Sequence, residues 1–426
     1  MKHTPTPTFL LAILALLLAS SPALAAQESE QQFEDITERV TEVRGLEAKV
    51  SVEVTPLTRE QLAAELQEDL SEEYPPDEVY ADERELIAFG LMDPDVDLHQ
   101  LVVDLYSEQV AGYYDPETSE LVVILDAADA AEFTPSQEVT YAHEIIHALQ
   151  DQNFDLDAGP LNREDISDDQ SLAVTALIEG DATHGEVLYL LRDPELLQAF
   201  VDEVENTEFD TEVLDSAPPI LSATLYFPYE YGYPFVEAVY EAGGWEAVNA
   251  AFSNPPSSTE QILHPEKFID REDPTIIEVP DFTTALEGEW TVFDDNTFGE
   301  FQIRVMLQQT SMSDEQAERA AAGWNGDTYV VAGTETEDAI HWVSEWESEQ
   351  DALEFARSWA LYETERWGAS PEYVAENVME FEADGVVSRI ILDGVTVTYV
   401  MAPSAAMADA ILEQTPSATP AATPAS

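Results

Sequence analysis

The sequence predicts an α+β protein with two domains. The chain has 426 residues, 45% of them hydrophobic, which is enough to bury two cores and is typical of globular proteins. Strand-like and helix-like segments alternate loosely along it, and we find no internal repeat. The character of the sequence changes near Glu287, which predicts a first domain over residues 26–284 and a smaller α+β domain over 285–413.

Both ends of the chain differ in composition from these domains. Residues 1–25 combine a basic start, the apolar run FLLAILALLLA and an Ala23-x-Ala25 motif, a pattern that predicts a cleaved secretory signal peptide. The run is shorter than the roughly 20 residues of a membrane span, and no later stretch is apolar enough for one. We therefore expect a secreted or cell-surface protein without a membrane span. Residues 414–426 are rich in Pro, Ala, Thr and Ser and predict a disordered tail.

The charge balance excludes one class of partner. The chain contains 15 Lys and Arg against 89 Asp and Glu, a net charge of −74. A field of this sign repels phosphate backbones, so we expect no nucleic-acid binding. It suits a halophilic protein that stays soluble in strong salt, and it also fits an acidic secreted protein from an ordinary environment. The chain has no cysteine, which excludes disulfides and thiolate ligands.

The first domain is expected to contain a strand, a helix, a hairpin and then two long helices. A strand precedes a helix that begins near Thr58, and the hairpin turns at residues 115–118. The sequence TPSQ at residues 134–137 has the capping-box pattern with proline at the first helical position, which predicts a helix through Gln150. A second helix is predicted over residues 168–191.

The second domain is expected to mix helices with several strands. Helices are predicted at residues 299–309 and 350–362. The expected strands, which are rich in β-branched and aromatic residues, are 327–333, 340–346, 386–392 and 395–401. Between the two long helices of the first domain and this region, the chain is aromatic and proline-rich.

The stretch VTYAHEIIHALQ places two histidines one helical turn apart. Residues i and i+4 lie on one face of a helix about 6 Å apart, so His143 and His147 can reach one metal ion. They lie along the edge of an apolar stripe, where we expect them to be half-buried and to face another element. Neutral imidazoles in such a place make good zinc ligands, and Glu144 is the general base in the H-E-x-x-H pattern. The alternative is a chance match on a solvated surface helix.

A tetrahedral zinc site requires a third protein ligand, and Glu179 is the best candidate. It lies in an apolar helical run, where a carboxylate is costly unless it is paired or bound to a metal. Gly180 beside it costs about 1 kcal/mol in a helix interior. A close approach of two helix backbones would explain both residues. Asp181, His184 and Glu186 are rival ligands, and a solvent-facing Glu179 is the alternative without a metal.

A zinc hydrolase also uses a donor that stabilises the oxyanion, usually His or Tyr. His264 in LHPEKF and Tyr229 in FPYEYG are the candidates, with His184 third. A purely structural role stays open for each of them.

HEIIH followed by a helical EGDA resembles the gluzincin metallopeptidases. More narrowly, VAGYYDPETSELVV, YAHEIIHALQDQ, LIEGDATHGE, PYEYGYPFV, STEQILHPEKF and DNTFGEFQIR resemble an uncharacterised family of secreted gluzincin-like proteins of haloarchaea and some bacteria, over most of the mature chain. The resemblance implies a zincin-like metallopeptidase domain with a mixed sheet and active-site helices. It also implies Zn²⁺ bound by His143, His147 and Glu179, with Glu144 as general base. The chain departs from better-known gluzincins in its longer gap before Glu179 and in Thr183, which replaces an Asp, so the partner of the histidines is unidentified.

The expected function is a secreted zinc metallopeptidase that hydrolyses peptide or protein substrates. In gluzincin-like folds an edge strand pairs with extended substrate, and residues 110–114 or 121–125 are the candidates for that edge. One alternative is a catalytically silent, zinc-containing cell-surface binding protein of the same fold. Another is an acidic surface protein without metal, in which the motif is a chance match.

Overall fold

A computed structural model describes most of the chain between its two ends. The described residues are 25–58, 61–62, 64, 74–109, 112–116, 118–124, 133–158, 161–163, 166–207 and 211–414. The predicted signal peptide at 1–25 lies outside them except for its last residue, and so does the predicted tail at 414–426 except for its first. Within the described part, no helix has the length and apolar character needed to cross a membrane.

The fold is α+β, as the sequence predicts, and it divides into two compact units. Unit 1 combines the segment that ends at Val79 with Val96–Asp273. Unit 2 combines Tyr80–Asp95 with the segment that begins at Pro274. The chain therefore enters unit 2, returns to unit 1 and enters unit 2 again.

Unit 1 contains a three-stranded sheet in the order β1-β3-β2. The central strand β3 (Glu120–Ile124) pairs parallel with β1 (Glu53–Leu57) and antiparallel with β2 (Gly112–Asp115). β2 and β3 form the predicted hairpin. Because β3 is central, residues 121–125 cannot be the free edge, and that alternative is wrong for the described residues 121–124; Leu125 lies outside them. Most of the helix expected after Thr58 also lies outside the described residues.

The rest of unit 1 is helical. Its helices are α1 (Ala25–Arg44), α4 (Leu98–Gln109), α5 (Pro135–Phe154), α6 (Asp168–Arg192), α7 (Pro194–Glu205), α8 (Glu212–Ser216), α9 (Pro219–Ser253), α10 (Thr259–Leu263) and α11 (Pro265–Asp270). The proline-rich segment is the long helix α9, which tolerates Pro228 and Pro234 and bends where Gly243 and Gly244 leave helical geometry.

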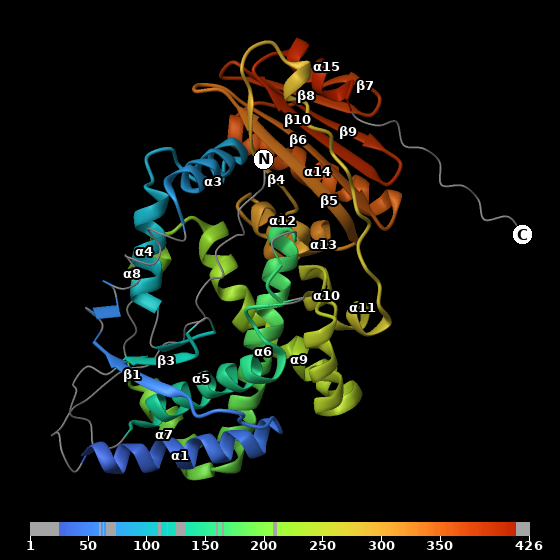
Figure 1. Ribbon diagram of the computed structural model, residues 1–426. Helices are drawn as coiled ribbons and strands as arrows, with labels where there is room; N and C mark the ends of the chain where they lie inside the picture. The colour runs from blue at the N-terminus through green and yellow to red at the C-terminus, as the bar shows by residue number, and fades with distance from the viewer. Residues whose placement is uncertain are drawn as a thin grey trace, which may run out of the picture. The chain divides into compact units, whose positions relative to one another are not determined.

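Helix α5 lies at the centre of the unit 1 core. Ile145 and Leu149 belong to a buried cluster that also contains Val40 of α1, Leu121 of β3 and Ala182 of α6. Figure 1 shows α5 between the small sheet and α1, with α6 beside it. Neighbours on several sides explain why the helix is buried from its first turn to Gln150.

Unit 2 is built on a seven-stranded antiparallel sheet in the order β4-β5-β6-β10-β9-β8-β7. Its strands are β4 (Thr291–Asn296), β5 (Trp324–Gly333), β6 (Asp338–Trp346), β7 (Glu372–Ala375), β8 (Val378–Ala383), β9 (Val386–Asp393) and β10 (Thr396–Ala402). Its helical segments are α3 (Pro76–Phe89, of which the part from Tyr80 belongs here), η1 (Thr283–Ala285), α12 (Gly299–Gln308), α13 (Asp314–Ala321), α14 (Glu349–Trp367) and α15 (Ala405–Leu412).

Helices α14 and α15 contact different side chains of the unit 2 sheet. Trp359 of α14 packs against Trp342 of β6 and Tyr399 of β10. Ile411 of α15 belongs to the core cluster that contains Val400 of β10. Because Tyr399 and Val400 are neighbours in a strand, their side chains point to opposite faces, so each helix covers one face. All four strands expected from the sequence are present, while β4, β7 and β8 were not predicted.

Candidate metal centre

Local sequence signals build the helix that presents the two histidines. Thr134 caps α5: its side chain accepts from the Gln137 N–H, and the Gln137 side-chain oxygen accepts from the Thr134 backbone N–H. Pro135 occupies the first turn, where the missing N–H costs nothing. This is the predicted capping box. The helix extends to Phe154, one turn beyond the predicted end at Gln150.

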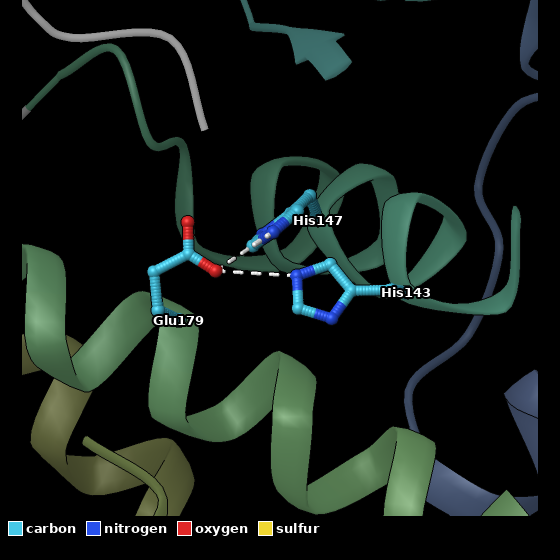
Figure 2. Close-up of side chains that lie close together, drawn as sticks. All are labelled: His143, His147 and Glu179. Carbon is cyan, nitrogen blue, oxygen red and sulfur yellow. Dashed lines mark hydrogen bonds and ion pairs between the residues drawn. The ribbon is translucent and has the colours of Figure 1, made fainter. Parts of the chain in front are cut away.

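The structure brings His143, His147 and Glu179 together. One ligand atom from each residue lies within 4.8 Å of the other two. The Nε2 atoms of His143 and His147 are 3.2 and 3.6 Å from the same oxygen, Oε2 of Glu179. Figure 2 shows the two rings of α5 and the carboxylate of α6 pointing toward one another. All three residues have 0% exposure, so the expectation that the histidines are half-buried is wrong: α6 and the core cover that side of α5 completely.

A close contact between α6 and α9 places Glu179. A Cβ atom added to Gly180 would overlap with the carbonyl group of Gly232 in α9, and one added to Gly232 would overlap with the Ala176 carbonyl. Both glycines therefore allow the two backbones to touch. The predicted close approach at Gly180 is confirmed, and its partner is Gly232. Three residues before Gly232, Tyr229 donates from its hydroxyl to Glu179 Oε1 at 3.1 Å.

Each histidine is held by a second partner through its other ring nitrogen. Nδ1 of His143 lies 3.1 Å from Glu186 Oε2, and Nδ1 of His147 lies 2.9 Å from Gln150 Oε1. Such partners fix ring orientation and leave Nε2 to face a cation. Glu186 was a rival ligand in the sequence, and it lies instead on the far side of the His143 ring. These two residues fill the role that the sequence left unidentified.

Sequence reasoning missed the roles of Gln150 and Glu186, although a signal for both is present. Gln150 follows His147 by three residues, and Glu186 follows Glu179 by seven, so each lies on the same helix face as a candidate ligand.

The charges of the site favour a cation at the point of convergence. Burial lowers the pKa of His143, but Glu179 and Glu186 outweigh it and raise that pKa to about 10. Burial raises the pKa of Glu179, but the two histidines outweigh it and lower that pKa to about 2. The pKa of His143 is raised and that of Glu179 is lowered because the carboxylates stabilise a positive charge between the side chains. That charge can be a proton on His143 or a metal ion.

Glu144 is buried beside this cluster and is poorly satisfied as a hydrogen-bond acceptor. Its exposure is 0%, and within the described part of the chain neither carboxylate oxygen makes a hydrogen bond of normal geometry. Burial raises its pKa to about 7, while the histidines and the Tyr114 backbone oppose the shift. The side chain lies near β2, because a Cβ added to Gly112 would be 3.8 Å from Glu144 Cγ.

The remaining candidate residues are Tyr229, His264 and His184, and they differ in how close they lie to the ligand cluster. Tyr229 contacts the cluster, but through Glu179 Oε1. His264 is half-buried between α10 and α11 and is not one of the three cluster residues; its catalytic role stays a prediction. The ring of His184 is surrounded by Tyr240 and Trp245, with centroids 4.8 and 5.4 Å away.

The residues present fit a zinc ion. Two imidazole nitrogens and one carboxylate oxygen are the ligand set of catalytic zinc sites that keep one position open. Nε2 of His147 is buried and makes no hydrogen bond of normal length with the described residues; it faces Glu179 Oε2 at 3.6 Å, so it is available to a metal ion between them. The third rival ligand, Asp181, pairs with Arg44 instead.

Comparison with known proteins bears on unit 2 alone. Residues 290–412 match a family described as a domain of unknown function (DUF8575). No curated protein and no solved structure matches the chain.

Proposed function

We propose that the protein is a zinc-dependent metallopeptidase of the zincin-like, gluzincin type that acts outside the cytoplasm on peptide or protein substrates. One observation carries the proposal: the ligand atoms of His143, His147 and Glu179 converge within 4.8 Å beside a buried Glu144. The small mixed sheet followed by two ligand-bearing helices supports the zincin-like assignment. The signal-peptide pattern at residues 1–25 supports export.

The chain's own residues supply the acid–base chemistry. A zinc ion, when bound, lowers the pKa of a water molecule and polarises the scissile carbonyl. Glu144 accepts the water proton on a carboxylate oxygen and donates it to the leaving amine. Its pKa of about 7 suits a group that exchanges protons near neutral pH. Among the described residues no hydrogen bond of normal geometry competes for its oxygens, which leaves them available for this proton.

Strand β2 is suited to holding an extended substrate. It is an edge strand of the described sheet, and Gly112 places it next to Glu144. An extended peptide can pair with such an edge through backbone hydrogen bonds. This supports residues 110–114 as the substrate edge, of which 112–114 are described.

Zinc stoichiometry and cleavage test the proposal together. The wild type, purified in molar salt, is expected to bind one Zn²⁺ and to cleave an unfolded protein substrate. Glu144→Gln should keep the zinc and lose about 10²–10⁴-fold in cleavage rate, the usual contribution of a general base. Glu195→Gln, on the exposed surface of α7, is the matched control and should behave as wild type.

The outcomes separate the candidate functions. A wild type that binds no zinc contradicts the proposal. Equal cleavage by wild type and Glu144→Gln contradicts the role of Glu144. Stoichiometric zinc with no cleavage of any unfolded substrate contradicts the peptidase and favours the silent binding protein.

A further inference from the structure

We infer that Gln150, Asp181 and Arg44 form a buried relay that holds His147 in the one tautomer able to bind the metal, and that they act as positioning residues. The inference rests on the proposed zinc site. Its observations are separate from the ligand cluster, because the relay lies on the far side of the His147 ring and reaches back to α1.

The orientation of Gln150 follows from its partners. Its Nε2 lies 3.0 Å from the Ile178 carbonyl oxygen and 2.8 Å from Asp181 Oδ2. Both are acceptors, so the amide nitrogen must point to them, and the amide oxygen must point the other way. That oxygen lies 2.9 Å from His147 Nδ1. Since Oε1 can only accept, His147 must carry a proton on Nδ1, and in the neutral ring Nε2 then keeps its lone pair.

Asp181 is fixed in turn by Arg44. The Nε atom of Arg44 is 2.8 and 3.0 Å from the two Asp181 oxygens, and both side chains have 0% exposure. Arg44 Nη2 donates to Asn249 Oδ1 at 2.8 Å, and the guanidinium lies 4.2 Å above the Trp245 ring. A buried ion pair is a weak source of stability, so its retention beside this site calls for another reason. Holding the Gln150 amide in one orientation is such a reason.

The two histidines are therefore held by different chemistry. His143 has a carboxylate, Glu186, directly on Nδ1, whereas His147 has a neutral amide with the carboxylate one step further away. Arg44 balances the charge of Asp181, so the relay orients His147 without adding net negative charge to the metal centre. Arg44 is the last residue of α1, so this helix forms part of the site.

Zinc affinity and a cobalt spectrum test the relay. Zn²⁺ dissociation constants are measured by competition with a chromophoric chelator, and Co²⁺ absorption reports the ligand geometry. Gln150→Met keeps the side-chain length but removes the acceptor, and it should weaken zinc binding about 10–100-fold and change the Co²⁺ spectrum. Gln152→Met on the same helix, whose amide hydrogen-bonds with the backbones of Lys49 and Val50 in the described part of the chain, is the matched control and should leave both unchanged.

A double variant tests the relay by rescue. Gln150→Glu combined with Asp181→Asn exchanges the amide and the carboxylate, so an acceptor still faces His147 Nδ1 and the net charge is unchanged. It should bind zinc within about tenfold of wild type, which a merely structural role for Gln150 does not predict. This variant also decides the matter if Gln150→Met fails to fold.

The results distinguish a failure of the proposed zinc site from a failure of the relay. Wild type that binds no zinc overturns the proposed function and the relay with it. Wild type that binds zinc, with Gln150→Met of unchanged affinity and unchanged Co²⁺ spectrum, overturns the relay alone.

Discussion

Glu144 in α5 and Asp327 in β5 are both buried carboxylates, but their hydrogen bonding is opposite. Glu144 has 0% exposure, and among the described residues neither of its oxygens accepts a hydrogen bond of normal geometry, although the Tyr114 backbone interacts with the carboxylate. Asp327 has 3% exposure and accepts four hydrogen bonds of 2.8–3.2 Å. Its donors are two backbone N–H groups and two indole N–H groups, from Phe298, Gly299, Trp324 and Trp342.

The difference separates a carboxylate that is saturated with hydrogen-bond donors from one that is left largely unsatisfied. Burial raises the pKa of both groups, and at Asp327 the four donors oppose the shift. Saturated in this way, Asp327 ties the start of α12 to two strands. An unsatisfied buried carboxylate costs stability, and proteins retain such groups mainly where function requires them. Unit 1 therefore holds a buried carboxylate that its hydrogen bonds do not explain, which the proposed function would explain, and unit 2 holds one that its four hydrogen bonds do explain.

Removal of the saturated carboxylate should have the largest effect. Asp327→Ala leaves four buried donors without an acceptor, so we expect the free energy of unfolding of unit 2 to fall by about 4 kcal/mol or more. Denaturant unfolding of the full chain measures it. Asp393→Ala, an exposed carboxylate at the end of β9, is the control. A loss below about 1 kcal/mol would show that Asp327 is not the structural clamp described above.

A second buried polar group of unit 2 should make stability depend on pH. Burial lowers the pKa of His341 to about 4, whereas the unfolded chain binds this proton near 6.5. Its contribution is therefore complete above pH 6.5 and is lost as the pH falls toward 4, by about 3 kcal/mol. Unfolding of wild type and His341→Gln at pH 7 and pH 4.5 checks this. Identical pH dependence in the two proteins would rule out His341 as the cause.

The contact between α6 and α9 should fail if one methyl group is added. Alanine normally stabilises a helix by about 1 kcal/mol relative to glycine. At Gly180 the methyl group would overlap with the Gly232 carbonyl, so we expect Gly180→Ala to destabilise unit 1 by about 1–3 kcal/mol and to weaken zinc binding. In Gly185→Ala the methyl group would meet only the mobile end of Ile146, and this control should be close to neutral. A stabilised Gly180→Ala would contradict the contact.

The smallest expected effect is the change in the free energy of unfolding when the poorly satisfied Glu144 is replaced. Glu144→Gln removes a buried ionisable group that accepts no hydrogen bond of normal geometry from the described residues, so the free energy of unfolding should stay the same or rise by up to about 1 kcal/mol. Asp327→Asn, the same chemical change at the saturated site, should be destabilising. Thermal unfolding of both variants measures the difference. A destabilised Glu144→Gln would end the distinction between the two carboxylates.

Local sequence patterns made part of the candidate site predictable. The capping box at residues 134–137, the histidine spacing and the apolar run around Glu179 are all local patterns, and the structure brings the three candidate ligands together. Gly180 indicated a close helix contact because glycine in a helix interior is costly. The α+β class and the four predicted strands of unit 2 followed from periodicity in the same way.

Tertiary packing decided what the sequence did not reveal. The full burial of the histidines depends on α6, α1 and the sheet covering α5 on several sides. No local pattern connects Arg44 with His147, because the relay crosses helices far apart in the chain. The helix α9 was hidden by Pro228 and Pro234, which usually interrupt helices but are accommodated here.

The excursion of residues 80–95 into unit 2 has a consequence for how the protein is made. Phe89 packs against Phe298, Tyr329 and Trp342, and its carbonyl accepts a hydrogen bond from Tyr362. During synthesis this segment leaves the ribosome well before the sheet that receives it. The region that matches the domain of unknown function would, if expressed alone from residue 290, lack a large aromatic side chain of its own core. In this protein the region that matches the family and the compact unit that contains it are therefore different pieces of chain.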